Sequence, residues 1–232
     1  MSVDTVMNEM AGAAAPGLTL PEGVELRRVG ERLTLMADGM ELAEDFREML
    51  PRLRPDRLGR ELLVKAVRVR GVEEIRVFDA TAGLGEDSML LAAAGFSVTM
   101  CEDDPVIAAL LADGLGRAVD DPVLSGIVGR MSLVEGDSIE ILPSLAEAPD
   151  VVYLDPMFPA RTKSAAVKKK FQLLHRLESP CADEASLMGA ALAARPRKIV
   201  VKRPIKAPVL AGVRPSHSIS GKAVRYDVIV PA

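Results

Sequence analysis

The sequence lacks the features that direct a protein to a membrane or to an oxidising compartment. No apolar run approaches the roughly 20 residues that a transmembrane helix needs, and the first residues carry acids where a secretion signal carries Lys or Arg. Only two cysteines are present, Cys101 and Cys181, and they form neither a metal-spaced nor a catalytic pattern. We therefore expect a soluble, cytoplasmic protein with buried thiols, no metal and no membrane partner.

Histidine is as scarce as cysteine. His175 falls between Leu174 and Leu177 of an expected helix, and neither it nor His217 has the partners of a general base. We assign no catalytic role to either. Hydrophobic residues make up 49% of the 232 residues, which is enough for the core of one domain of ordinary size.

The net charge is −4, but the charges are unevenly distributed. Overall acidity argues mildly against a nucleic-acid partner. Between residues 161 and 206, however, twelve cations stand against three acids, Glu178, Asp183 and Glu184. This bias indicates a face presented to a polyanion, although a solvated helix face would have the same composition. The cations are Arg161, Lys163, Lys168, Lys169, Lys170, Arg176, Arg195, Arg197, Lys198, Lys202, Arg203 and Lys206.

The front of the chain predicts a small attachment rather than a domain of its own. Residues 1–17 lack periodicity and predict a disordered tail. Residues 18–57 predict a small N-terminal cap, with a hairpin over 18–36 and a short helix over 40–50. The arginines of the loop 52–61 could grip phosphate or could belong to a solvated connector.

From residue 58 to residue 232 we expect the main domain. Strands and helices alternate there, which is typical of a parallel sheet covered on both faces. The last two predicted strands form an antiparallel hairpin instead, which is typical of class I methyltransferases. The expected strands are 75–78, 98–101, 131–134, 151–154, 199–202, 216–220 and 226–230. The expected helices are 61–69, 86–94, 105–119, 138–145, 166–177 and 183–194.

The stretch 77–87 predicts a ligand-binding turn. An apolar run ends in Asp79 and is followed by Gly83 and Gly85, which adopt conformations closed to other residues and leave no Cβ to repel a ligand. The helix that follows points free N–H groups at this turn. Ser88 stands where a dinucleotide fingerprint has Gly or Ala, so a cofactor without a pyrophosphate fits better.

Acids end or follow four predicted strands, where ligands of parallel sheets bind. Glu102 lies about 20 residues beyond the glycine turn and is placed to accept hydrogen bonds from both ribose hydroxyls. Asp137, with Ser138, could contact an adenine amino group or merely cap a helix. Asp87 would lie near a methionine-like ammonium group. Together with Asp79 and Asp155, these acids predict an adenosine-type cofactor.

An acid, a rigid corner and an aromatic ring follow the fourth predicted strand, as Asp155, Pro156 and Phe158. This run resembles the Asn/Asp-Pro-Pro-Tyr/Phe motif of amino-group methyltransferases. An exocyclic base amine is a poor nucleophile until acceptors hold its protons, and the Asp155 carboxylate and the Pro156 carbonyl can be those acceptors. Phe158 can stack on the base, which is worth roughly 1 to 3 kcal/mol. Proximity and electrostatic placement would supply most of the acceleration.

Five runs of the sequence are similar to the ribosomal small subunit methyltransferase J family. The most specific are Asp155-Pro156-Met157-Phe158-Pro159 and Lys163-Ser164-Ala165-Ala166-Val167-Lys168-Lys169. The others lie at 79–85, 104–115 and 200–204, and the likeness extends over about 58–230.

This resemblance implies an α/β, Rossmann-like class I methyltransferase fold. The expected sheet is mostly parallel and seven-stranded, with a C-terminal antiparallel hairpin and the small N-terminal cap. The resemblance also implies methyl transfer from S-adenosylmethionine to N2 of a guanosine in 16S rRNA, with 16S rRNA or the small ribosomal subunit as partner. By position, the family's cofactor contacts correspond to Glu86, Asp87, Glu102, Asp103, Asp137, Ser138 and Asp155.

Cations near the Asp155 corner are suited to phosphate contacts that position RNA without reading its sequence. They are Lys163, Lys168, Lys169, Lys170, Lys202 and Arg203. Two alternatives stay open. The same fold could methylate another amine, in adenine, a protein side chain or a small metabolite, or the protein could be a non-catalytic RNA-binding relative.

Overall fold

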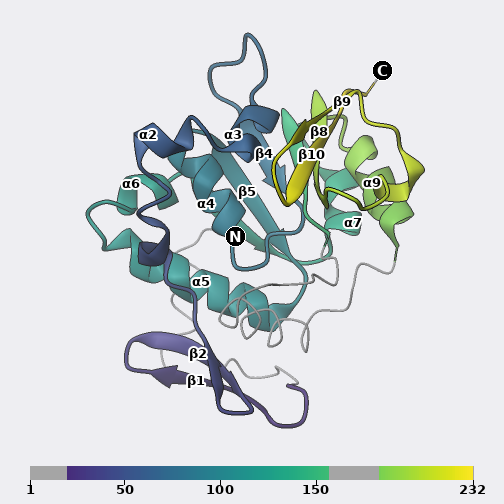
Figure 1. Ribbon diagram of the computed structural model, residues 1–232. Helices are drawn as coiled ribbons and strands as arrows, with labels where there is room; N and C mark the ends of the chain where they lie inside the picture. Colours follow the sequence, from purple (N-terminus) through teal and green to yellow (C-terminus); the bar gives the residue numbers. More distant parts are fainter. Residues whose placement is uncertain (1–19, 157–182, 232) are drawn as a thin grey trace.

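The computed structural model describes residues 20–156 and 183–231 (Figure 1). Several predictions lie outside these residues: the tail over 1–17 and the helix over 166–177. The same holds for five site residues, Phe158, Lys163, Lys168, Lys169 and Lys170.

A seven-stranded sheet forms the centre of the protein, in the order β6-β5-β4-β7-β8-β10-β9. The pairs within β6 to β8 are parallel, whereas β10 runs antiparallel to both of its neighbours. This arrangement confirms the predicted fold class. The strands are β4 (Arg76–Asp79), β5 (Ser97–Glu102), β6 (Met131–Glu135), β7 (Val151–Leu154), β8 (Lys198–Pro204), β9 (His217–Ser220) and β10 (Val224–Ile229).

Successive residues of each central strand enter opposite cores, because side chains alternate across a sheet. In β7, Val151 and Tyr153 pack with the helices α3 (Leu62–Val67), α4 (Glu86–Ala93) and α6 (Ser125–Val128). Val152 and Leu154 pack instead with α9 (Glu184–Ala193) and with residues beside α7 (Ser138–Ile141). Both faces of the sheet are therefore buried at this central strand, which explains its continuous apolar run.

The chain reverses its direction of winding between β4 and β7. From β4 it proceeds outward to β5 and β6, then returns to the other side of β4 as β7. Ligands of open α/β sheets bind beyond the carboxyl ends of the strands at such a switch point. Asp79 and Asp155, which end and follow these two strands, therefore lie at the expected position.

The N-terminal segment forms a three-stranded antiparallel sheet of β1 (Val24–Val29), β2 (Arg32–Ala37) and β3 (Met40–Leu42). The predicted hairpin is confirmed, but the predicted helix over 40–50 was wrong at its start. Asp38 and Gly39 have positive φ and turn the chain back onto β2 as a third strand. Only the short 3₁₀ helix η1 (Phe46–Met49) is helical in that range.

The helix α5 (Pro105–Val119) lies between the two sheets (Figure 1). Its residues Ile107 and Leu110 share a buried cluster with Leu35 of β2, whereas Leu111 belongs to the core of the main sheet. Asp104 begins this helix and accepts hydrogen bonds from two of its backbone N–H groups. Apolar residues on two sides of α5 are thus buried, one set against each sheet.

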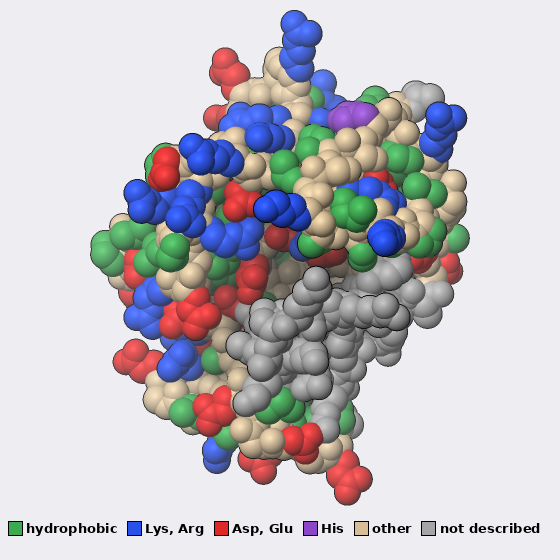
Figure 2. Space-filling view, in the orientation of Figure 1, with side chains coloured by type: hydrophobic (Ala, Val, Ile, Leu, Met, Phe, Trp, Pro, Cys, Tyr) green, Lys and Arg blue, Asp and Glu red, His purple; other side chains and the backbone are tan. Residues whose placement is uncertain are grey.

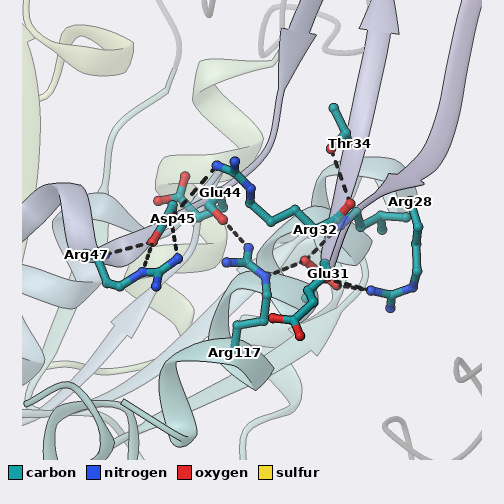
Figure 3. A network of polar contacts seen from close by, with 10 residues as sticks. Arg28, Glu31, Arg32, Thr34, Glu44, Asp45, Arg47 and Arg117 are labelled. Carbon is teal, nitrogen blue, oxygen red and sulfur yellow. Dashed lines mark hydrogen bonds and ion pairs between the residues drawn. The ribbon is translucent and has the colours of Figure 1, made fainter. Parts of the chain in front are cut away.

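A polar network fixes the small sheet to α5 (Figure 3). Both oxygens of Asp113 are used: Oδ1 accepts from Arg28, and Oδ2 accepts from the backbone N–H of Leu33 and from Arg117, each at 3.0 Å. Arg117 also donates to the carbonyl of Glu44. The side chain of Asp113 is only 7% exposed, whereas its partner Arg28 is 52% exposed.

Two further helices differ slightly from their predicted bounds. The helix predicted over 138–145 is divided into α7 and the 3₁₀ helix η2 (Leu142–Ser144), because Pro143 cannot continue the α-helical hydrogen bonds. Asp183 stands just before α9 and caps it. No helix in the described part of the chain is long and apolar enough to cross a membrane.

Candidate functional site

The turn between β4 and α4 has room on one side only. Gly83 and Gly85 have φ of +54° and +77°, which favour glycine. A Cβ on Gly85 would lie 2.7 Å from Cδ1 of Leu111, whereas a Cβ on Gly83 would meet no atom of the described residues within 4 Å. Gly85 is therefore required by packing, and Gly83 borders space that the described part of the chain leaves open for a ligand to approach the backbone.

Asp79 stabilises this turn through its buried carboxyl group. Its carboxyl group is buried, and it accepts hydrogen bonds from the N–H of Thr81 at 3.2 Å and from the hydroxyl of Ser88 at 2.6 Å. Burial raises the pKa of Asp79 to about 7, although both hydrogen bonds oppose the change. The carboxyl group thus ties the end of β4 to the first turn of α4.

Glu102, at the end of β5, lies against the same turn. Its carboxylate accepts from the N–H of Gly83 at 2.7 Å and from the N–H of Asp104 at 3.0 Å. Burial raises its pKa above the ordinary value, and the two backbone N–H groups oppose that rise. Each carboxylate oxygen retains a second lone pair that can accept from a ligand hydroxyl. Asp103, the next residue, is exposed.

Asp137 caps α7, as one of its two predicted roles required. Its carboxylate accepts from the N–H of Ile139 at 2.8 Å. Ser138, the first residue of α7, is 7% exposed. Both residues follow β6, the strand beside β5, so they lie on the same edge of the sheet as Glu102.

The Asp155 corner is attached directly to the glycine turn. The backbone N–H of Asp155 donates to Oγ1 of Thr81 at 2.7 Å, and Pro156 is buried. Because β4 and β7 are hydrogen-bonded neighbours, the corner and the turn are held together by both the sheet and this side-chain contact.

Lys202 joins two of the predicted site carboxylates. Its Nζ lies 2.6 Å from Oδ2 of Asp87 and 2.8 Å from Oδ2 of Asp155. The hydroxyl of Tyr153 also donates to Oδ2 of Asp87, at 2.6 Å. These side chains come from β8, α4 and β7, and the exposed fractions of Lys202, Asp87 and Asp155 are 25, 19 and 35%.

The charges of this cluster stabilise one another. Burial by itself raises the pKa of Asp87, but the Lys202 ammonium and the hydrogen bond from Tyr153 outweigh it and hold that pKa below its ordinary value. Burial raises the pKa of Asp155, and Lys202 opposes the rise. Burial lowers the pKa of Lys202, but the two carboxylates outweigh it and raise that pKa.

Two predicted RNA contacts require correction. Lys202 does not extend from the rim of the site but points inward, between Asp87 and Asp155. Arg203 is fully buried on the opposite face of β8, where it donates to the carbonyl of Pro208 and to Glu184. The physical reason is the alternation of side chains along a strand, which cannot be read from a run of basic residues.

The sequence also left three polar residues of the site unassigned: Thr81, Ser88 and Tyr153. The sequence marks Ser88 only as a departure from a fingerprint, yet Ser88 lies in the first turn of α4 and donates to Asp79, and a buried acid needs such a partner. Tyr153 is the one polar side chain in the apolar run of β7, which was the available signal for a buried hydrogen bond.

Comparison with known proteins identifies the family. The family model described as "Putative SAM-dependent methyltransferase" matches residues 20–231, where SAM is S-adenosylmethionine. Two proteins named "Ribosomal RNA small subunit methyltransferase J" are 49% identical (Thioalkalivibrio sulfidiphilus) and 48% identical (Pseudomonas aeruginosa) to this chain. The chain belongs to this family of S-adenosylmethionine-dependent methyltransferases. The family predicted from the sequence is thereby confirmed.

These matches cover 73 and 72% of this chain and 68 and 65% of the two relatives, so the chain spans about two thirds of their length. The crystal structure of a SAM-dependent methyltransferase from Neisseria gonorrhoeae is 34% identical, with a TM-score of 0.76 over 99% of this chain and 91% of that one. An rRNA methyltransferase from Streptomyces viridochromogenes shares the fold at 18% identity, with a TM-score of 0.53 over 76% of this chain and 85% of that one.

The residues of the site fit the cofactor of this family. S-adenosylmethionine combines an adenosine with a positively charged sulfonium and a methionine ammonium group. The site offers open backbone at Gly83, acids at the ends of two strands and a second pair of carboxylates at Asp87 and Asp155. Among the described residues, no group of three or more His, Cys, Asp or Glu could hold a metal ion.

Proposed function

We propose that the protein transfers a methyl group from S-adenosylmethionine to the exocyclic N2 amine of a guanosine in 16S rRNA, in the cytoplasm. The observation that carries the proposal is the contact between the Asp155 corner and the glycine turn through Thr81. This contact sets an acceptor for amine protons beside the place where the family's cofactor fits. The names of the relatives supply the substrate class.

Several residues would hold the cofactor. Glu102 would accept from the ribose hydroxyls, and the backbone at Gly83 would lie against the ligand, because the space there is open. Asp137 and Ser138 would face the adenine. Asp79, being buried, would act by shaping the turn rather than by direct contact. The remaining proposed contacts are Gly85, Glu86, Asp87, Asp103 and Asp155.

On the substrate side, the chain aligns an amine and removes its proton. The bound cofactor supplies an electrophilic methyl group on a positively charged sulfur. Asp155 and the carbonyl of Pro156 would accept the two amine protons and so direct the nitrogen lone pair, while Phe158 would stack on the base. Lys163, Lys168, Lys169 and Lys170 would contact phosphates of the RNA, which fixes its position without reading its sequence.

The Asp155→Ala variant tests this assignment. We expect transfer to 16S rRNA to fall by roughly 10² to 10³-fold, because a positioned acceptor is lost, while calorimetry shows cofactor binding within a few-fold of the wild type. The exposed Asp120, at the far end of α5, provides the control variant Asp120→Ala, which should transfer normally.

Mass-spectrometric mapping of 16S rRNA from cells lacking the protein identifies the substrate. The proposal predicts the loss of one N2-methylguanosine, restored by the wild-type gene and not by Asp155→Ala. A complete set of methylated guanosines in these cells, or full transfer by Asp155→Ala, would refute it.

A further inference from the structure

Lys202 is the only described residue whose side chain bridges the two carboxylates assigned to the cofactor and to the substrate. Its Nζ is within hydrogen-bonding distance of Asp87, on the first turn of α4, and of Asp155, after β7. Tyr153 adds a hydroxyl on the same oxygen of Asp87. The ammonium is thus held from two sides at the centre of the site, and the side chain is only 25% exposed.

Without this cation the site would hold two carboxylates in close proximity. Both contact the same nitrogen atom, at 2.6 and 2.8 Å, so the two oxygens are neighbours. Like charges at such a distance in a buried site cannot both be retained, and one of the two groups takes up a proton. A protonated Asp155 could no longer accept a proton from the substrate amine.

The charge of the cluster also matches the reaction. Lys202 carries one positive charge and Asp87 and Asp155 carry two negative charges, so the cluster has a net charge of −1, with Tyr153 neutral. A net negative site favours a sulfonium and the positive charge that develops on the amine. The nitrogen gains a methyl group and must release one proton, for which the ionised Asp155 is the acceptor in reach.

We propose that Lys202 is a positioning residue for methyl transfer: it bridges Asp87 and Asp155 so that both carboxylates stay ionised and oriented, one toward the cofactor and one toward the substrate amine. This inference rests on the proposed role of Asp155 in the transfer reaction. Lys202 does not touch the reacting atoms in this scheme, and it acts through its two partners.

Other charged and titratable groups surround the cluster and set the background for a test. From each neighbouring element they are Asp79 of β4, Tyr226 of β10, Arg203 of β8, and Arg52 and Glu61 of the segment before β4. None of these is altered in the variants below, so a change in titration reports on Lys202 itself.

The direct test is a titration of the Asp side chains by ¹³C NMR in the wild type and in Lys202→Met. Asp155→Asn and Asp87→Asn assign the two resonances. We expect the titration midpoint of Asp155 in Lys202→Met to rise by about 1 to 3 pH units, because a cation within hydrogen-bonding distance is removed. An unchanged midpoint would overturn the proposal. Should Lys202→Met not fold, Lys202→Gln replaces it in the same measurement.

The second readout is the pH profile of single-turnover transfer to 16S rRNA. In Lys202→Met, the fall in rate at low pH should shift to higher pH by the same amount, about 1 to 3 pH units. The rates at high pH should be near those of the wild type. Lys202→Arg should restore the wild-type pH profile. Lys65→Met, on the exposed side of α3, is the matched control. A uniform loss of rate at every pH would indicate a structural role only. If the wild type methylates no rRNA, the proposed function fails, while the NMR titration still decides the role of Lys202.

Discussion

Asp79 illustrates how a single buried residue can serve the site without facing a ligand. Its carboxyl group is 1% exposed and joins β4 to α4 through Thr81 and Ser88. The described residues provide no ion-pair partner for a carboxylate in this position, and the neighbouring Asp87 and Asp155 are themselves acids and raise its pKa further. The hydrogen bonds survive in either protonation state, because the Ser88 hydroxyl can donate or accept.

The stability of the protein should therefore depend on pH through Asp79. Its folded-state pKa of about 7 exceeds the value of about 3.9 in an unfolded chain, so the folded protein binds the extra proton between these values. Its contribution to stability is present below pH 4 and is lost as the pH rises through 7. Asn mimics the protonated form. We expect the stability of Asp79→Asn relative to the wild type to increase by about 2 to 3 kcal/mol between pH 5 and pH 8.

Urea denaturation at the two pH values measures this difference. Asp120→Asn, which changes an exposed carboxylate, is the control and should show no such trend. If the difference between Asp79→Asn and the wild type were the same at pH 5 and pH 8, Asp79 would not carry the proposed proton.

At this scale the sequence predicted which residues end the strands but not where every side chain points. An apolar run followed by an acid identified Asp79, Glu102 and Asp155, because the end of a buried strand is marked by the loss of apolar character. Lys202 and Arg203 are neighbours in the sequence and point to opposite faces of β8, one into the site and one toward α9. Which face each takes depends on the register of the sheet, which a basic run does not reveal.

At the scale of elements, the turn that contains Gly83 and Gly85 is positioned by α5 and η1 as well as by β4, the strand that precedes it. Gly85 directly precedes α4 and faces Leu111 of α5. A ring atom of Phe46 in η1 lies 3.5 Å from the position of its absent Cβ. Leu84 packs into the cluster that joins α5 to the N-terminal sheet. The small sheet therefore shares a buried cluster with this turn.

Gly83→Ala and Gly85→Ala form a matched pair that separates packing from ligand approach. Both place alanine at positive φ, at a cost of about 1 to 2 kcal/mol. Gly85→Ala must also displace Leu111, and we expect it to be less stable than Gly83→Ala by roughly 1 to 3 kcal/mol. Gly83→Ala should instead lower S-adenosylmethionine affinity, by roughly tenfold, because its Cβ enters the open space.

Thermal unfolding and calorimetry with S-adenosylmethionine check the two effects separately. Equal destabilisation of the two variants would show that the contact with Leu111 is relieved without cost. Unchanged affinity in Gly83→Ala would move the ligand away from this part of the turn.

The type of an element could be predicted wherever the sequence had a clear helical pattern or an unbroken apolar run. The helix over 105–119 and the strand over 151–154 have the predicted bounds, since Pro105 with Asp104 marks the start of one and an unbroken apolar run defines the other. The helix expected over 40–50 failed at β3, because the turn at Asp38 and Gly39 makes strand pairing with β2 available. That pairing is a tertiary effect which overrides local preference.

At the scale of the whole molecule, cations that are close in the sequence lie at opposite ends of a strand. Arg195 precedes β8, Lys198 begins it, and Lys202 lies near its end. These cations are therefore spread from the amino end of the strand to its carboxyl end. A seven-residue strand covers roughly 20 Å. The described cations of this region, from Arg195 to Lys206, therefore do not form one face.

A basic surface does adjoin the site, on the segment from Arg52 to Arg60. The exposed side chains there are Arg52, Arg54, Arg57 and Arg60, and Figure 2 shows Lys and Arg gathered over α2 (Pro55–Leu58) and α3. Arg52 contributes to lowering the pKa of Asp87, so this segment is within electrostatic reach of the site. The surface ion pair of Arg54 with Asp56 is exposed on both sides and would exchange readily for a phosphate.

We expect this arginine surface to bind phosphates of the RNA substrate. In the variant Arg54→Ser/Arg57→Ser/Arg60→Ser, RNA affinity should fall, and the slope of log affinity against log salt should decrease in magnitude by about 2, since each lost phosphate contact on single-stranded RNA contributes about 0.7. Arg70, Arg130 and Arg195 are exposed and precede strands β4, β6 and β8 at the opposite edge of the sheet. Their triple Ser variant carries the same change in charge and should keep the wild-type slope. Fluorescence anisotropy across a salt series measures both, and equal slopes in the two variants would mean that net charge alone, rather than this surface, attracts the RNA.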